Sequence, residues 1–338
     1  MKILVTGGCG FVGSAFIRSI IARRSDLSII NLDKLTYAGN PANLTLIEEN
    51  PRYRFVHGDI CDAALLDKLF AEEKFEAVIN YAAESHVDRS LLDPESFLLT
   101  NVMGTQRLLE AARRHATKKF IQISTDEVYG EILEGEADEH AAYVPRSPYS
   151  ASKAAADHVC HAYHETFGVP VIVTHAANMY GPYHFPEKVI PLFITNLMEG
   201  KKVPLYGEGA QIREWLQVED HARAIELILD KGIPGNIYNI GTGERFSNLA
   251  LTHKVLAAFG FGDEKVERVK DRAGHDARYA LSAQKIKQEL GWKPTVSFSD
   301  GLKQTIEWYK QNEAWWKPIK SGEYLTYYEK QYGSRERA

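Results

Sequence analysis

Short apolar runs alternate with longer amphipathic segments through the first half of the chain. Six runs rich in β-branched residues are typical of strands: 3–6, 28–32, 53–57, 77–82, 120–124 and 170–175. Between them, apolar residues recur at helical spacing over 13–24, 62–73, 97–115 and 150–167. Nearly continuous apolar strands that alternate with helices indicate a parallel sheet covered on both faces. The sequence therefore predicts a doubly wound α/β fold.

The pattern changes after about residue 176, where prolines, glycines and aromatic residues cluster. Such a composition suits a smaller and less regular unit of mixed α/β structure. Residues 235–241 again predict a short strand that rejoins the main sheet, and 284–290 and 299–312 have helical spacing. The predicted domains are a sheet domain over 1–176, rejoined by about 214–244, and a substrate-binding domain over 177–213 and 245–338.

Composition and charge argue against several classes of function. The 338 residues are 44% hydrophobic and 25% charged, which is ordinary for a globular protein. The net charge of −5 offers no basic surface for nucleic acid or an acidic membrane. We expect no signal peptide and no membrane span, because no apolar run is long enough. Three cysteines without a CxxC spacing indicate free thiols, so we expect a cytoplasmic protein.

A glycine-rich loop, GGCGFVG, joins the first predicted strand to the first predicted helix. Gly7 and Gly10 would let the backbone approach a pyrophosphate, and Gly13 would let the helix pack closely against the strand. Asp33 ends the second strand twenty residues later, where an acid suits a ribose 2′-hydroxyl. This context predicts a Rossmann-type dinucleotide site that favours NAD over NADP, although Lys34 stands beside the acid. Asp59 is a candidate for the adenine amino group or, equally, for a helix cap.

A tyrosine and a lysine lie one turn apart at the start of the predicted helix over 150–167. Tyr149 and Lys153 have i, i+4 spacing, so their side chains share a helix face. A nearby ammonium favours the phenolate of a tyrosine, which could then accept the proton of an alcohol. Two adjacent acids, Asp126 and Glu127, follow the strand over 120–124. By position alone they suit a solvated turn.

Several longer segments carry a resemblance to a known family. They include DKLTYAGN, AAESHVDRS, STDEVYG, SPYSASK, NMYGPYHFPEKVIPL, REWLQVEDHARA, NIGTG and RAGHDARYA. With these segments in this order over nearly the whole chain, the sequence resembles the extended short-chain dehydrogenases/reductases. Within that superfamily it is similar to the nucleoside-diphosphate-sugar 4,6-dehydratases, above all those that act on dTDP-glucose in deoxysugar biosynthesis.

The resemblance implies a mechanism in which the sugar is oxidised, dehydrated and reduced in turn. Tyr149 would take the proton of the 4-hydroxyl while NAD takes the hydride, and Thr125 would hydrogen-bond the 4-oxygen. Glu127 would then remove the C5 proton while Asp126 helps the C6 hydroxyl leave as water, and hydride would return to C6. Adjacent carboxyl groups in a closed site push their pKa values apart, which suits one acid and one base.

The resemblance also assigns the binding residues. The expected NAD contacts are Gly7, Gly10, Phe11, Val12, Gly13, Asp33, Lys34, Thr36, Asp59, Ile60, Ala82, Ser124, Tyr149, Lys153 and Asn178. The expected nucleotide-sugar contacts are Ser85, Asn178, Lys188, Val189, Tyr206, Arg213, Asn248, Arg272 and His275. Arg213 would clamp the diphosphate, for which a planar guanidinium is well suited. The superfamily's usual dimer face, the helices 97–115 and 150–167, implies a homodimer.

The chain departs from the family pattern around Asn178. His175, Ala176, Ala177 and Met179 stand where the family usually has an arginine or asparagine, a Cys-Ser pair and a second asparagine. Glu214 and Gln217 are further departures. None falls on the acid, the base or the Tyr/Lys pair, so they leave the sugar and the nucleotide open rather than the reaction class.

Other functions share parts of this sequence pattern. A nucleotide-sugar 4-epimerase or a UDP-glucuronate decarboxylase would share the glycine loop and the Tyr149/Lys153 pair, but neither needs an acid at C6. A non-catalytic NAD(H)-sensing protein would need neither Asp126 nor Glu127. The histidines His158, His161 and His164 do not match the H-E-x-x-H order, so we expect a solvated or interface face there and no metal.

Overall fold

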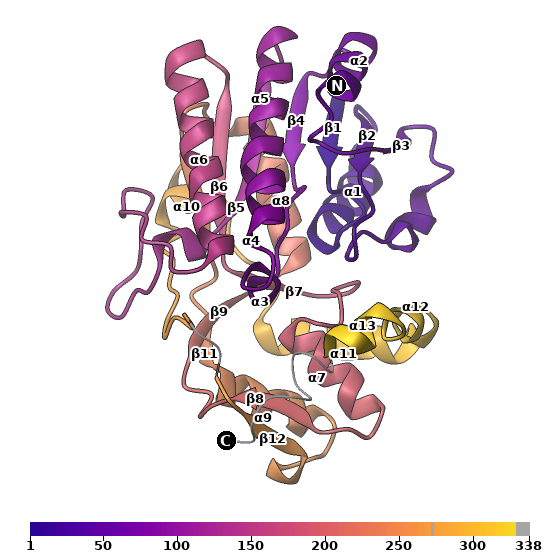
Figure 1. The fold of residues 1–338 in the computed structure, drawn as a ribbon, viewed down its shortest axis with the longest axis vertical. Helices are drawn as coiled ribbons and strands as arrows, with labels where there is room; N and C mark the ends of the chain where they lie inside the picture. Colours follow the sequence, from indigo (N-terminus) through magenta and orange to yellow (C-terminus); the bar gives the residue numbers. More distant parts are fainter. Residues whose placement is uncertain (272–273, 329–338) are drawn as a thin grey trace.

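The computed structural model describes residues 1–271 and 274–328. Its main sheet is built from β1 (Lys2–Thr6), β2 (Ser28–Asp33), β3 (Tyr53–His57), β4 (Ala77–Asn80), β5 (Lys119–Thr125), β6 (Val171–Ala176) and β10 (Ile237–Ile240). These seven strands are parallel and lie in the order β10-β6-β5-β4-β1-β2-β3 (Figure 1). The predicted parallel sheet is confirmed, and the late strand does rejoin it beside β6.

Helices cover both faces of this sheet. One layer is α1 (Phe11–Arg23), α8 (Val218–Lys231) and α10 (Gln284–Leu290), and the other is α2 (Ala63–Glu73), α5 (Thr105–Arg114) and α6 (Pro148–Phe167). Strand residues supply both layers in alternation, since Ile3 and Val5 pack in the first core while Leu4 packs in the second. Both faces are therefore apolar, as the nearly continuous apolar runs predicted. The helix α8 was not predicted.

The predicted helix over 97–115 is not a single α-helix. It consists of α4 (Pro94–Phe97), a π-helical stretch η2 (Leu98–Gly104) and α5. The widened turns accommodate Asn101, whose side chain bonds the backbone N–H and C=O of Glu84 (2.9 and 3.1 Å) and the hydroxyl of Ser152 (2.8 Å). The π-helical turns have a long-range cause, because the partners of Asn101 come from a distant loop and from α6. Such π-bulges often occur at functional sites.

The second half of the chain adds a smaller unit beside the carboxyl ends of the strands (Figure 1). Its strands are β7 (Asn178–Tyr180), β8 (Val203–Tyr206), β9 (Ile212–Gln217), β11 (Arg245–Ser247) and β12 (Val266–Val269), in the pairings β11-β9-β7 and β12-β8. Its helices include α7 (Val189–Met198), α9 (Asn248–Ala258), α11 (Phe298–Gln311), α12 (Glu313–Ile319) and α13 (Glu323–Tyr328). They share a separate apolar core that contains Phe193, Trp215, Leu251 and Trp316. The exact domain boundaries stay a prediction.

The remaining elements are short. They are η1 (Pro41–Ile47), α3 (Val87–Ser90), η3 (Asp126–Tyr129) and η4 (Asp263–Lys265). Over residues 1–271 and 274–328, no helix has both the length and the apolar character needed to cross a lipid bilayer.

Candidate active site

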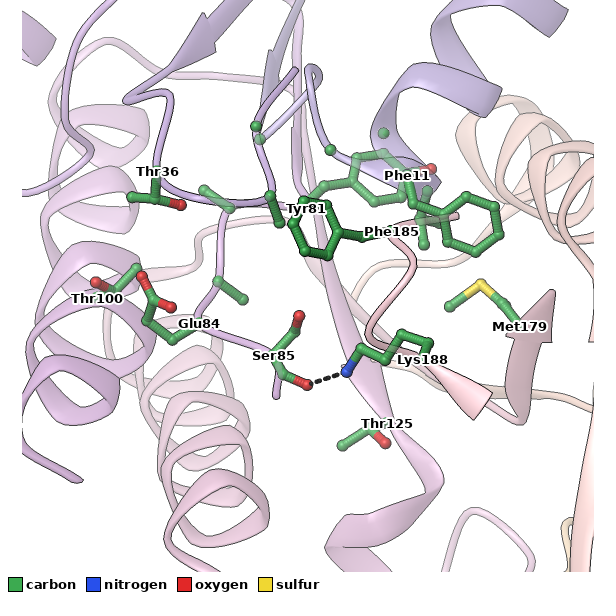
Figure 2. A pocket seen from close by; sticks show the side chains of 18 of the residues that line it. Phe11, Thr36, Tyr81, Glu84, Ser85, Thr100, Thr125, Met179, Phe185 and Lys188 are labelled. Carbon is green, nitrogen blue, oxygen red and sulfur yellow. Dashed lines mark hydrogen bonds between the residues drawn. The ribbon is translucent and has the colours of Figure 1, made fainter. Parts of the chain in front are cut away.

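A pocket of about 330 Å³ lies at the carboxyl ends of the main-sheet strands. This is where doubly wound folds place their ligands. The predicted residues that line it are Gly7, Gly10, Phe11, Val12, Gly13, Asp33, Lys34, Thr36, Asp59, Ile60, Ala82, Ser85, Ser124, Thr125, Asp126, Glu127, Tyr149, Asn178, Lys188 and Val189. The pocket thus brings together side chains from distant parts of the chain, such as Phe11, Ser85 and Lys188 (Figure 2).

The glycine loop follows β1 directly and has little spare room. Gly7 has φ 65°, and a Cβ there would lie 2.6 Å from the backbone nitrogen of Ala82. A Cβ on Gly13 would lie 2.5 Å from the carbonyl oxygen of Gly7. Gly10 is the N-cap of α1, so the unpaired backbone N–H groups of that helix face the pocket side of the loop. The loop therefore has the close backbone approach and the helix dipole that a pyrophosphate requires.

Asp33 ends β2 at the pocket wall. Its carboxylate accepts hydrogen bonds from the backbone N–H groups of Cys9 and Leu35 (both 2.8 Å), while burial raises its pKa. Two bonds leave further acceptor positions on the carboxylate for ribose hydroxyls. Lys34 pairs with Asp59 (2.7 Å), so its charge is already balanced beside the acid. The cap of α2 is Asp62, which accepts from the N–H of Leu65, so the capping alternative for Asp59 is wrong.

Asn178 gives a direct test of whether a nicotinamide dinucleotide fits. Its side-chain oxygen is buried at the pocket and has no hydrogen-bond partner among the described residues. A buried amide oxygen needs a donor, and the carboxamide of a nicotinamide would supply one. Together with the glycine loop and Asp33, this orphan acceptor indicates that the pocket fits NAD.

The two adjacent acids have different environments. Asp126 is 3% exposed, and burial with the charges of Glu127 and Glu214 raises its pKa well above the usual value. One of its oxygens is within 3.3 Å of the Thr125 hydroxyl, and the other lacks a partner within the described part of the chain. Glu127 is half-buried and accepts from the hydroxyl of Tyr279 (3.4 Å). Asp126 is thus set up to hold a proton beside a second carboxyl group.

Tyr149 and Lys153 lie on the first turns of α6, which begins with a capping box between Ser147 and Ser150. Tyr149 lines the pocket, whereas Lys153 is 4% exposed behind it and donates to the carbonyl oxygen of Ile123 (2.6 Å). Burial and the charge of Glu127 raise the pKa of Tyr149, while a hydrogen bond with Thr125 lowers it. Burial therefore favours the protonated form of Tyr149, and a positive charge beside its ring would favour the phenolate.

The other expected substrate contacts form a second group in the smaller unit. Arg213 on β9 is 5% exposed, bonds the carbonyl oxygens of Ile212 and Asp276, and lies over the ring of Tyr279 at 4.1 Å. Tyr206 and His275 contact each other through their rings, with 6.0 Å between centroids.

Two further predicted substrate contacts, Asn248 and His275, are both connected to Asp271. Asn248 begins α9, and its backbone N–H bonds Gln211, whose side chain bonds Asp271. His275 bonds the same Asp271 (2.6 Å). Arg272 lies outside the described residues.

Other pocket residues were not singled out from the sequence. Tyr37, Glu84, His184, Phe185, Glu187 and Trp215 also line the pocket. The sequence did point to their surroundings, since four of them lie in the segments DKLTYAGN and NMYGPYHFPEKVIPL. The residue types alone did not indicate which side chains of these segments point into the pocket. Tyr279 was also missed, although it contacts both Glu127 and Arg213 and so joins the two groups.

Comparisons with known proteins agree with this geometry. Residues 4–305 match the model of the family described as GDP-mannose 4,6 dehydratase. A dTDP-glucose 4,6-dehydratase of Streptomyces niveus is 51% identical over 96% of this chain and 98% of that protein. The crystal structure of the Streptomyces venezuelae dTDP-glucose 4,6-dehydratase with NAD bound has a TM-score of 0.92 at 49% identity, covering 94% of this chain and all of that one. A UDP-glucose 4-epimerase of Thermotoga maritima has a TM-score of 0.86 at 31% identity, covering 93% of this chain and all of that one. The chain belongs to the nucleotide-sugar 4,6-dehydratase family, among the dTDP-glucose 4,6-dehydratases.

Proposed function

We propose that this protein is an NAD-dependent lyase that converts dTDP-glucose to its 4-keto-6-deoxy derivative with loss of water. Identity of about half over the full length to dTDP-glucose 4,6-dehydratases supports the substrate. The observation that carries the reaction class is the buried Asp126 beside Glu127 in the same pocket as Tyr149. That arrangement offers an acid, a base and a second proton acceptor to one sugar.

NAD would be held by the glycine loop, by Asp33 at the ribose and by Asn178 at the carboxamide. When bound, NAD would supply a hydride acceptor at C4 and, once reduced, a hydride donor at C6, so no external reductant is consumed. The charge balance between Lys34 and Asp59 leaves Asp33 as the local selector against a 2′-phosphate. The chain's own contribution is to bind, to orient and to exclude water.

Tyr149 would accept the proton of the sugar 4-hydroxyl. Thr125 already bonds the tyrosine, so its hydroxyl is placed to contact the 4-oxygen as well. Lys153 is buried one turn below and would stabilise the phenolate through its positive charge. These three residues therefore serve the oxidation and the final reduction.

Asp126 and Glu127 would serve the elimination between those steps. A ketone at C4 acidifies the C5 proton, which Glu127 would remove. Asp126, held in its protonated form by burial, would donate to the departing C6 oxygen so that it leaves as water. The neighbouring negative charge keeps the acid protonated, which is why the two groups are adjacent.

The nucleoside diphosphate would lie against the second group of residues. Arg213, which lies over the ring of Tyr279, would clamp the diphosphate, and Lys188 with Val189 would approach it from the start of α7. Lys188 donates to the carbonyl oxygen of Ser85 (3.0 Å), so two of the proposed substrate contacts are joined directly (Figure 2). Tyr206, Asn248, Arg272 and His275 complete the proposed contacts.

Epimerases and decarboxylases on the same fold are the alternative functions. The similarity to a 4-epimerase supports a shared scaffold and a shared oxidation at C4. Neither alternative gives a role to a buried, protonated Asp126. An NAD(H)-sensing protein would need neither member of the acid pair.

The assembly and location are proposed on separate grounds. Leu98, Leu99 and Met103 are between 43% and 52% exposed on η2, beside α6, and would be covered in a homodimer. The thiols of Cys9, Cys61 and Cys160 are free, which suits a reducing cytoplasm.

The proposal is tested by incubating purified protein and NAD with dTDP-glucose, UDP-glucose and GDP-mannose. Mass spectrometry should detect loss of one water, fastest with dTDP-glucose, together with solvent deuterium at C5. Product of unchanged mass whose proton NMR spectrum shows inversion at C4 would support the epimerase instead. No change in any sugar nucleotide would overturn the enzymatic assignment.

A further inference from the structure

A buried polar network lies behind the pocket, one helical turn beyond Lys153 on α6. At its centre is Asp157, which is 3% exposed on α6. One of its oxygens accepts from the hydroxyl of Ser124 (2.7 Å) and lies 3.1 Å from Nε2 of His175. His175 is fully buried on β6. A carboxylate this deep needs such partners, because an unpaired buried charge is costly.

Asp157 acts on Lys153 through its charge. The two residues are four apart on α6 and share a helix face. Burial lowers the pKa of Lys153, and the negative charge of Asp157 opposes that shift. The hydrogen bond from Lys153 to the carbonyl oxygen of Ile123 fixes the amine but adds no counter-charge. Asp157 is therefore the carboxylate placed to keep this buried lysine an ammonium ion.

We propose that Asp157 is a positioning residue for the Tyr149/Lys153 pair, holding the charge of Lys153, and that His175 and Ser124 orient its carboxylate. This inference rests on the proposed roles of Tyr149 and Lys153. Tyr149, Lys153 and Asp157 then form one line along α6, from the reacting oxygen to the interior of the sheet. Ser124 on β5 and His175 on β6 both contact the carboxylate of Asp157, the last residue of this line.

The groups around His175 determine the orientation of its ring. The hydroxyl of Tyr129 lies 2.8 Å from its Nδ1 and donates to Asn239 (3.0 Å), while the hydroxyl of Tyr143 lies 3.1 Å from its Nε2. These partners come from η3, from the loop before α6 and from β10. They fix the ring so that Nε2 points at Asp157.

Other titratable groups also act near this network. Cys160 interacts with Lys153 and Asp157, and the charges of Asp138 and Glu139 act on Tyr129. An arginine or asparagine, which the family usually has at 175, could not present the same ring between two tyrosines.

Asp157→Asn tests the proposal because it removes the charge and keeps the shape. The profile of kcat/KM against pH for dTDP-glucose should lose its alkaline side at lower pH than in the wild type, since Lys153 then gives up its proton more readily. We expect kcat near neutrality to fall about tenfold to a hundredfold. The charge of Asp157 acts on Tyr149 as well as on Lys153, whereas the charges that shift the pKa of Asp126 are those of Glu127, Glu214 and Arg213. The acidic limb therefore reports on the tyrosine, which must lose its proton, and the alkaline limb reports on the lysine, which must keep its own.

Three further variants separate charge from structure. Asp157→Glu keeps the charge and should restore the alkaline limb to the wild-type pH even if the rate stays low. His175→Asn leaves Asp157 in the protein but removes the ring that orients it, so the rate should fall while the alkaline limb stays at the wild-type pH. His161→Asn, at an exposed position on α6, should behave as wild type.

The outcomes distinguish this inference from the proposed function. Wild-type protein that dehydrates no sugar nucleotide would contradict the proposed function itself. An active wild type with an unshifted limb in Asp157→Asn would overturn only the role of Asp157. If Asp157→Asn does not fold, His175→Asn with wild-type rate and profile would overturn the orientation by His175, and Asp157→Glu with a displaced limb would overturn the role of the charge.

Discussion

Burial of the Asp126 carboxyl group has a consequence for stability as well as for catalysis. Its pKa is raised in the folded protein, whereas in the unfolded chain an aspartate titrates near pH 4. Between these two pKa values the folded state binds more protons than the unfolded state, so this group lowers stability as the pH rises. Asp126→Asn cannot ionise and removes that loss. The free energy of unfolding of the variant, relative to wild type, should therefore increase from pH 4 to pH 7.

Turnover of the same variant should change in the opposite direction. Without a proton to donate, elimination should slow by about 10²–10⁴, while C4 oxidation and C5 deuterium exchange continue. Urea unfolding at several pH values and single-turnover mass spectrometry give the two readouts. Glu134→Gln, at an exposed loop carboxylate, is the control and should change neither. A stability difference that does not vary with pH would contradict the raised pKa, and equal loss of every chemical step would contradict the role as acid.

The glycine loop is the element whose geometry is least tolerant of change. Gly7 and Gly135 both have positive φ, 65° and 68°, but a Cβ on Gly7 meets backbone at 2.6 Å whereas one on Gly135 meets open space. Gly135→Ala should cost only the left-handed backbone term, about 1–2 kcal/mol. Gly7→Ala should cost more, because β1 and the turn after β4 must separate, and it should abolish NAD binding. Urea unfolding and calorimetric titration with NAD check both; equal stabilities for the two variants would contradict the clash.

At the level of elements, the sequence predicted what depends on local pattern. The strands from β1 to β6 and the helix α6 follow from periodicity, and the glycine loop follows from its place between strand and helix. The sequence did not predict η2, because the π-helical turns depend on contacts of Asn101 with Glu84 and Ser152, which no local pattern encodes. It also missed Tyr279, although this residue lies in the segment RAGHDARYA, since nothing in that segment shows that its ring lies between Glu127 and Arg213. Within the site, backbone motifs were therefore predictable from the sequence, but the side-chain partners were not.

For the whole molecule, the exposed leucines near the active site suggest how assembly and catalysis are coupled. Leu98, Leu99 and Met103 lie on η2, the same stretch whose Asn101 bonds Ser152 on α6 between Tyr149 and Lys153. Covering this apolar surface in a dimer would fix η2 and, through Asn101, the start of α6. Leu98→Asp should therefore yield a monomer in sedimentation velocity and lower kcat with little effect on the overall fold.

The control for that experiment must be an equally exposed apolar residue elsewhere. Leu46 is 82% exposed on η1, away from η2 and α6, so Leu46→Asp should remain dimeric and active. A wild-type protein that sediments as a monomer would contradict the proposed assembly directly. A monomeric Leu98→Asp with wild-type kcat would support the proposed dimer interface but contradict the coupling between assembly and catalysis. Asn101 would then hold α6 without help from a second subunit. Reduced kcat that recovers at high protein concentration would place the coupling in the interface itself.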